Sequence, residues 1–216
     1  MSSKMWKTLW ESSFGLETAL TPMLLKKDDR IIFLGDSLTQ RTGLLSSTNP
    51  AARYGHPYLG NYVDILAKRL LVHYPQLALQ AFNAGVGGIM LPHLLQRLAG
   101  YLEDFEPTWA VLFMGQNDAK KYRAAEFETH LREVLGILRD AHVSVLQLST
   151  TPHPGEEDKN RVLATYDGIV ERLCQEFDHR FVDAKTPFDR VLGYNVGADR
   201  PVQLFSDGCH LSGLGN

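Results

Sequence analysis

The sequence lacks the features of a disulfide-bonded, membrane-spanning or nucleic-acid-binding protein. Only two cysteines occur in 216 residues, Cys174 and Cys209, which is too few for a disulfide scaffold and favours a reducing compartment. The formal net charge is -3 and basic residues are dispersed, so we expect no nucleic-acid partner. Charged side chains interrupt residues 1–30, which leaves no signal-peptide core and no membrane span. We therefore expect a cytoplasmic protein, and nothing in the sequence defines its oligomeric state.

Signatures of nucleotide and metal sites are also missing. No Gly-x-x-x-x-Gly-Lys motif and no paired-glycine dinucleotide motif follows a strand-like segment, which argues against a nucleotide-binding module. The eight histidines never pair at the helical spacing of zinc ligands, so we expect no metal and no cofactor. The Gly-x-Ser-x-Gly elbow of α/β-hydrolases is absent.

An alternation of strand-like and helical patterns is what the sequence does contain. The expected strands cover residues 31–34, 77–83, 108–115, 143–149 and 180–184. Residues 124–141 and 159–177 have the spacing of amphipathic helices. Their expected core-facing residues are Phe127, Leu131, Val134, Leu135 and Leu138, then Val162, Leu163, Tyr166, Ile169, Val170 and Leu173. This order predicts one α/β domain with a parallel sheet covered by helices on both faces.

Ser37 directly follows the first expected strand, in the segment "GDSLTQ". The carboxyl edge of a parallel sheet is where ligands bind in open α/β folds, so a serine at that edge is a candidate nucleophile. Ser and Asp before a helix also commonly cap its free amides. Taken alone, this segment leaves both interpretations open.

Two further segments place small polar residues at the same edge. The second strand leads into "NAGVGG", residues 83–88, and the third leads into "GQND", residues 115–118. Exposed backbone amides and an asparagine side chain can stabilise an oxyanion, although glycines also serve plain turn geometry. The residues by themselves do not distinguish among Gly85, Gly87 and Gly88.

The segment "SDGCHLSG" near the chain end contains Asp207 three residues before His210. A carboxylate at this spacing can reach the imidazole and orient it as a general base for a serine. A surface turn without function is the alternative for an isolated Asp-x-x-His.

The four segments, in this order, resemble the blocks of the SGNH hydrolase family, also called GDSL esterases and lipases. The resemblance implies a flavodoxin-like three-layer α/β/α sandwich with a five-stranded parallel sheet. It also implies that Ser37 is the nucleophile, His210 the base and Asp207 the residue that orients the base. The oxyanion hole would consist of the backbone amides of Ser37 and Gly88 and the side-chain amide of Asn117.

The resemblance extends over residues 30–216, and we expect residues 1–29 to form an N-terminal extension that packs on this domain. Family members usually continue into a helix that covers the sheet, whereas this chain ends six residues after His210, so that helix is expected to be missing or replaced. Asp36 and Asp118 are interpreted as structural residues. Cys209 is interpreted as a small packing residue beside the base.

The segment "YGHPYLGNYVDIL" resembles a subgroup of the family associated with acetylated carbohydrates. Aromatic walls suit a sugar ring or an acyl chain, and the candidates for such a wall are Tyr54, Tyr58, Tyr122 and Tyr194. Residues 40–58 are polar and offer no long hydrophobic lid, which favours small acyl groups. We therefore expect a serine esterase that removes acetyl groups from a carbohydrate or a similar small ester. The alternatives are a lipase, lysophospholipase or thioesterase of the same family, or an inactive interaction module.

Overall fold

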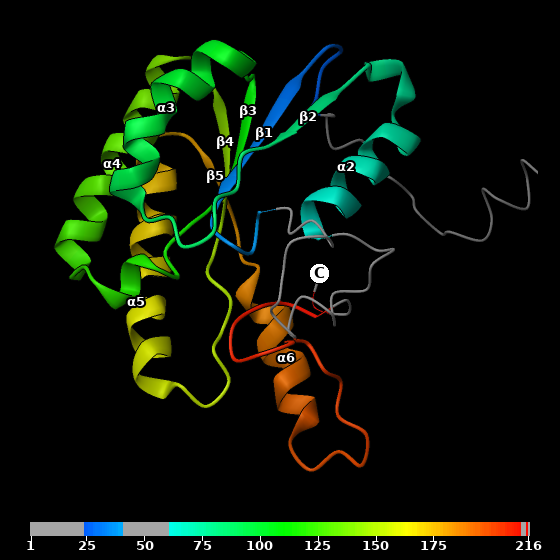
Figure 1. The fold of residues 1–216 in the computed structure, drawn as a ribbon, viewed down its shortest axis with the longest axis vertical. Helices are drawn as coiled ribbons and strands as arrows, with labels where there is room; N and C mark the ends of the chain where they lie inside the picture. The colour runs from blue at the N-terminus through cyan, green and yellow to red at the C-terminus, as the bar shows by residue number, and fades with distance from the viewer. Residues whose placement is uncertain (1–23, 41–60, 213–214, 216) are drawn as a thin grey trace, which may run out of the picture.

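The computed structural model describes residues 24–40, 61–212 and 215, and these residues form a parallel five-stranded sheet with helices on both sides (Figure 1). The strands are β1 (Arg30–Gly35), β2 (Gln80–Asn83), β3 (Trp109–Phe113), β4 (Ser144–Leu148) and β5 (Arg180–Val182). The helices are α2 (Tyr62–His73), α3 (Leu91–Phe105), α4 (Ala124–Asp140), α5 (Glu157–Glu176) and α6 (Lys185–Asn195). The predicted three-layer α/β fold is confirmed.

The strand order β2-β1-β3-β4-β5 determines where a ligand site belongs. Ile31 of β1 pairs with Ala81 of β2 on one side and with Trp109 of β3 on the other, and both pairings are parallel. The chain leaves β1 toward one edge of the sheet and later returns to β3 on the opposite side. In open α/β sheets the crevice at such a switch point binds ligands, at the carboxyl ends of the strands.

The central strand β1 is buried on both faces, as its continuous apolar run predicts. Ile32 and Leu34 belong to the core shared with α3, α4 and α5, which lie together on one side of the sheet (Figure 1). Ile31 and Phe33 point to the other face and pack with residues of α2. This double burial makes the end of β1 a rigid platform for the residues that follow it.

The helical patterns are mostly confirmed. All five expected core residues of α4 are buried. In α5, Leu163, Tyr166, Val170 and Leu173 are buried, but the expectation for Val162 is wrong, because this side chain is 37% exposed. Val162 precedes Leu163 by one residue, a rotation of about 100° that takes it off the buried stripe. No helix in the described residues is long and apolar enough to cross a membrane.

The second expected strand is shorter than predicted. Pro75–Leu77 form a short 3-10 helix, and Ala78 has a left-handed backbone with φ of 49°, so pairing with β1 starts only at Gln80. The proposed N-terminal extension lies largely outside the described residues. Within its described end, Leu25 packs against the α2 side of the core.

Candidate active site

The turn after β1 holds Ser37 in a defined position. The carbonyl of Asp36 accepts the N–H groups of Thr39 and Gln40 at 3.1 and 2.8 Å, and Asp36 Oδ1 accepts the N–H of Leu38 at 2.9 Å. Residues 37–39 therefore form a tight turn in which Asp36 bonds local amides, as expected. Residues 37–40 are a turn and a bend and not part of a helix, so the described residues give no support to the helix-cap alternative.

Ser37, His210 and Asp207 are joined by two hydrogen bonds. Ser37 Oγ lies 3.0 Å from His210 Nε2, and His210 Nδ1 lies 2.8 Å from Asp207 Oδ2. The distances and the order of the groups are those of a Ser-His-Asp triad. Because Asp207 Oδ2 can accept the proton on Nδ1, the lone pair of Nε2 is left for the serine hydroxyl. The structure thus brings together all three residues that the sequence predicts.

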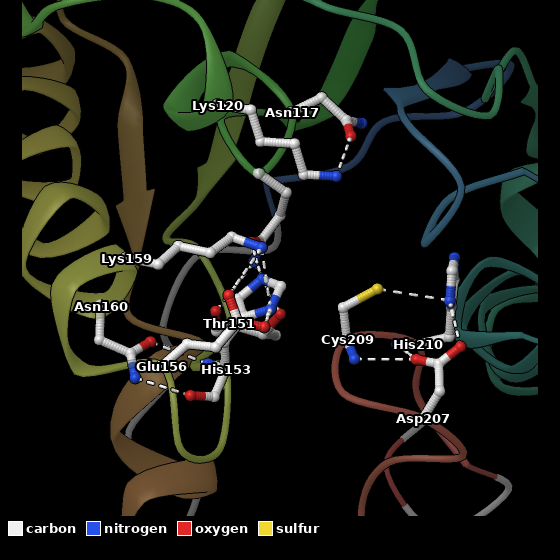
Figure 2. Close-up of polar contacts among 11 residues, drawn as sticks. Asn117, Lys120, Thr151, His153, Glu156, Lys159, Asn160, Asp207, Cys209 and His210 are labelled. Atoms are coloured by element: carbon white, nitrogen blue, oxygen red, sulfur yellow. Dashed lines mark hydrogen bonds and ion pairs between the residues drawn. The ribbon is translucent and has the colours of Figure 1, made fainter.

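Backbone contacts fix the turn that carries the acid and the base. Asp207 Oδ1 accepts the N–H groups of Cys209 and His210 at 2.8 and 2.7 Å (Figure 2). The N–H of Ser206 donates to the carbonyl of His210 at 2.8 Å, which closes the turn at its base. This turn also contacts Ser37, which follows the first strand, through His210. A surface turn without function would not need that contact.

Charges within the triad stabilise an ion pair. Burial opposes ionisation of Asp207, but hydrogen bonds from the N–H groups of His210 and Cys209 and from the imidazole lower its pKa to about 2. The hydrogen bond with Cys209 Sγ is the largest cause of a rise in the pKa of His210 to about 9. Burial opposes this rise, and Asp207 adds to it. The sulfur lies 3.4 Å from His210 Nδ1.

Replacement of Cys209 with alanine is expected to shift the pH dependence of activity. His210 can accept a proton from Ser37 only when its imidazole is neutral, so activity should be lost as pH falls through the pKa of His210. Without the sulfur the imidazolium loses its largest stabilising contact, and the acidic limb of the kcat/KM profile should move to lower pH. Cys174→Ala, which removes a cysteine buried in α5, is the matched control and should leave the limb in place. An unshifted limb in Cys209→Ala would contradict this assignment.

The backbone N–H groups of the glycine-rich segment after β2 differ in their hydrogen-bond partners. The N–H of Gly85 donates to Asn83 Oδ1 at 3.0 Å, and the N–H of Gly87 donates to Gln40 Oε1 at 2.7 Å. In the part of the chain that the structure describes, the N–H groups of Gly88 and Ser37 donate to no acceptor. Of the three glycines that the residues alone left equal, Gly88 is therefore the one with an amide available to an oxyanion.

Geometry also explains why glycine is needed at two of these positions. A Cβ on Gly85 would lie 2.4 Å from the backbone nitrogen of Gln40, so this glycine allows the segment to approach the serine turn. Gly88 has a φ of +74°, a conformation that strains other residues. A Cβ on Gly87 would lie 3.9 Å from Ser37 Cβ, which places this segment directly beside the serine.

The side chain of Asn117 contacts Asp36 and Ile89, the residues next to Ser37 and Gly88. Its Nδ2 donates to Asp36 Oδ2 at 3.1 Å and to the carbonyl of Ile89 at 3.4 Å, while its Oδ1 accepts from Lys120 Nζ at 3.4 Å (Figure 2). Burial raises the pKa of Asp36 to about 6, although the hydrogen bond from the N–H of Leu38 lowers it. At neutral pH Asp36 is therefore a carboxylate that accepts a hydrogen bond from Asn117. These contacts direct the amide nitrogen toward the serine turn and the carbonyl oxygen away from it.

Asp118, the next residue, has a structural contact. Its Oδ1 accepts the N–H of Leu91 at 2.9 Å, at the first turn of α3, which supports its interpretation as a structural residue. Its side chain is fully buried, and burial raises its pKa.

A buried histidine behind the catalytic turn was not singled out from the sequence. His153 follows β4, is 2% exposed, and its Nε2 lies 2.6 Å from Gln116 Oε1. Its Nδ1 lies 3.0 Å from Lys159 Nζ, and its ring also interacts with the backbone carbonyl of Gly208 inside the catalytic turn. Burial, followed by Lys159, lowers the pKa of His153, which favours a neutral ring. The only signal in the sequence is that His153 follows a strand end.

Of the four tyrosines expected to line the substrate site, the structure describes two, Tyr122 and Tyr194. Tyr54 and Tyr58 lie outside the described residues. The ring of Tyr122 packs edge-on against His130 of α4, with ring centroids 5.0 Å apart. Tyr194 is 67% exposed near the end of α6 and lines a hollow formed with residues 196–200. A substrate wall built from these side chains stays a prediction.

Comparisons with known proteins identify the family and the fold. The profile of the GDSL-like lipase/acylhydrolase family matches residues 33–216. An acetylxylan esterase of Geobacillus stearothermophilus is 23% identical over 184 residues, covering 79% of this chain and 82% of the relative. The crystal structure of Axe2, an acetylxylan esterase from the same organism, has a TM-score of 0.71 at 22% identity and covers 89% of this chain and 91% of its own.

Other solved structures give the same result for the fold. LAE5, an alpha/beta hydrolase enzyme from the metagenome of Lake Arreo, has a TM-score of 0.71 at 22% identity, covering 90% of this chain and 92% of its own. Three structures of Axe2 are catalytic mutants in which a histidine, an aspartate or a serine is replaced by alanine. The family profile spans most of the chain and all four motif segments. The chain therefore belongs to the GDSL-like lipase/acylhydrolase family and is a carboxylic ester hydrolase.

Proposed function

We propose that this protein is a serine esterase that removes small acyl groups, acetyl above all, from a carbohydrate. The observation that carries the proposal is the pair of hydrogen bonds from Ser37 through His210 to Asp207 at the carboxyl edge of the sheet. Two backbone amides without an acceptor among the described residues, those of Ser37 and Gly88, and the side chain of Asn117 complete the proposed site.

The proposed reaction uses each group in turn. His210 Nε2 takes the proton of Ser37 Oγ as the oxygen attacks the ester carbonyl, and the resulting oxyanion is stabilised by the two amides and Asn117. His210 then gives this proton to the departing alkoxide oxygen, which leaves an acyl group on Ser37. Water repeats the sequence with His210 as base and releases the carboxylic acid. Asp207 keeps the proton on Nδ1 and stabilises the imidazolium formed in each step.

Similarity supports the choice of an acetylated carbohydrate. The curated relative and Axe2 are acetylxylan esterases, and two Axe2 variants are described as acetyl-xylooligosaccharide esterases. The segment that we expect to border the substrate, residues 40–58, lies outside the described residues except for Gln40. The acyl preference therefore rests on the sequence of this segment and on the relatives.

Activity on p-nitrophenyl esters should fall as the acyl chain lengthens. A buried methylene is worth about 0.8 kcal/mol, so an apolar channel for long chains would reward each added carbon with severalfold tighter binding. We expect kcat/KM to decrease from acetyl or butyryl to decanoyl and longer esters, and acetylated xylooligosaccharides to be among the better substrates. A rate that rises steadily through dodecanoyl, measured below micelle-forming concentrations, would assign the protein to the lipase or lysophospholipase alternative.

The geometry of the triad and the state of the cysteines bear on two further points. An inactive interaction module has no support from the site, because all three triad side chains are in hydrogen-bonding positions. Both cysteines are free, Cys174 in the core and Cys209 half-buried. We propose a cytoplasmic location on this cysteine usage.

A further inference from the structure

Three potential metal ligands converge on the far side of the catalytic imidazole from Ser37. One ligand atom each from Asp207, Cys209 and His210 lies within 4.8 Å of the other two. Cys209 Sγ is 3.4 Å and Asp207 Oδ2 is 2.8 Å from His210 Nδ1, and Figure 2 shows both directed at this nitrogen. All three belong to one turn of four residues, whose backbone is held by Asp207 Oδ1.

The ligand types and their spacing suit a zinc-like cation. A thiolate, an imidazole and a carboxylate are common zinc ligands, with bonds of roughly 2.3, 2.0 and 2.0 Å. Tetrahedral angles at such an ion put sulfur and nitrogen about 3.5 Å apart, and nitrogen and oxygen about 3.3 Å apart. The sulfur already stands at this spacing from Nδ1. The carboxylate would have to withdraw by only about 0.5 Å.

We propose that Zn²⁺ or a similar thiophilic divalent cation binds Cys209 Sγ, His210 Nδ1 and Asp207 Oδ2 and thereby inhibits the esterase. A metal bound to Nδ1 takes the place of the proton on that nitrogen. The ring then either loses this proton or carries it on Nε2. With the proton on Nε2, the ring has no lone pair to accept the proton of Ser37. The cation also takes the carboxylate that would stabilise imidazolium. The bound metal would therefore act as an inhibitor and not as a cofactor of the reaction.

Two neighbouring features set the strength of binding. The ion has to replace the hydrogen bond between His210 and Asp207, which the resting enzyme already makes. Lys159 is close enough to interact electrostatically with Cys209, and its positive charge repels a cation. With three ligands and an open fourth position, we expect reversible binding in the micromolar range rather than the affinity of a four-ligand structural site.

The test compares three proteins with zinc chloride in a buffer that does not bind metal. We expect wild type to lose most of its p-nitrophenyl acetate activity at micromolar zinc, to recover it with EDTA, and to resist magnesium and calcium. Cys174→Ala keeps Cys209 and should respond as wild type does. Cys209→Ser keeps a small polar side chain but removes the thiolate, so about tenfold or more zinc should be needed. Each variant is compared with its own rate without zinc.

Calorimetry gives a readout that does not depend on activity. Wild type and Cys174→Ala should bind one zinc ion per chain, and Cys209→Ser should bind it about tenfold or more weakly. The effect on activity rests on the proposed role of His210, whereas the binding does not. Zinc binding by an enzyme that hydrolyses no ester would overturn the proposed function but keep the site. No saturable binding, or equal binding by Cys209→Ser, would overturn the site while leaving the esterase intact.

Discussion

Replacing Ser37 with alanine should lower kcat for p-nitrophenyl acetate by about 10⁴-fold to 10⁶-fold, the range found when a triad nucleophile is removed. The variant loses the oxygen that forms the acyl-enzyme, and His210 and the oxyanion donors have no attacking group to assist. Stability should change little, because the Ser37 side chain is half-buried and, among the described residues, makes one hydrogen bond, to His210. Initial rates and thermal unfolding of the purified variant measure both effects.

A second serine provides the matched control for this substitution. Ser144 is exposed at the first residue of β4, at the opposite edge of the sheet from the triad. Ser144→Ala should keep the wild-type rate within about twofold, since it is a surface change away from the site. A Ser37→Ala protein that kept a tenth or more of the activity would place the nucleophile elsewhere in the chain.

Asn117→Ala should lower kcat by about 10²-fold to 10³-fold and leave KM nearly unchanged, because an oxyanion donor acts mainly on the transition state. The variant also loses the contact between Asn117 Nδ2 and Asp36 Oδ2. Asp36 is buried and charged above a pKa of about 6, so the variant should be less stable at neutral pH. Michaelis–Menten kinetics and thermal unfolding at the same pH separate the two consequences.

Asn195→Ala controls for the loss of an asparagine that is hydrogen-bonded to its surroundings. The Asn195 side chain makes two hydrogen bonds of 2.7 Å to the backbone of Val202, near the end of α6. Its removal should lower stability without the loss in kcat. If Asn117→Ala raised KM and left kcat intact, Asn117 would bind the ground-state substrate and the oxyanion hole would consist of backbone amides.

The sequence predicts the fold because its apolar segments agree with the geometry of a parallel sheet. β1 reads as an unbroken run of Ile31, Ile32, Phe33 and Leu34 since both of its faces are buried, and α4 shows a full helical stripe since one face meets the core. Errors occur where local geometry overrides the pattern. The left-handed backbone at Ala78 delays β2, and the rotation of a single residue exposes Val162.

The site is predictable to the extent that strand ends reveal it. Ser37 and Asn117 follow the ends of β1 and β3, so their convergence follows from the parallel sheet. Asp207 and His210 lie beyond α6 and follow no strand, so only the resemblance to the family predicts that they meet Ser37. The residues alone left the three glycines equal and only the family resemblance favoured Gly88, because the distinction depends on the contacts of Gly85 with Asn83 and of Gly87 with Gln40. The role of His153 could not be found either, because its partners Gln116, Lys159 and Gly208 come from three separate segments.

Labelling with a fluorophosphonate tests the central claim most directly, since this reagent reacts with an activated serine and leaves a stable adduct. Wild type should take up one label per chain, and mass spectrometry of its peptides should locate the label on Ser37. Ser37→Ala should take up none, while Ser144→Ala should be labelled as wild type is. A label on another residue, or unchanged labelling of Ser37→Ala, would contradict the assignment of Ser37 as the nucleophile of this esterase.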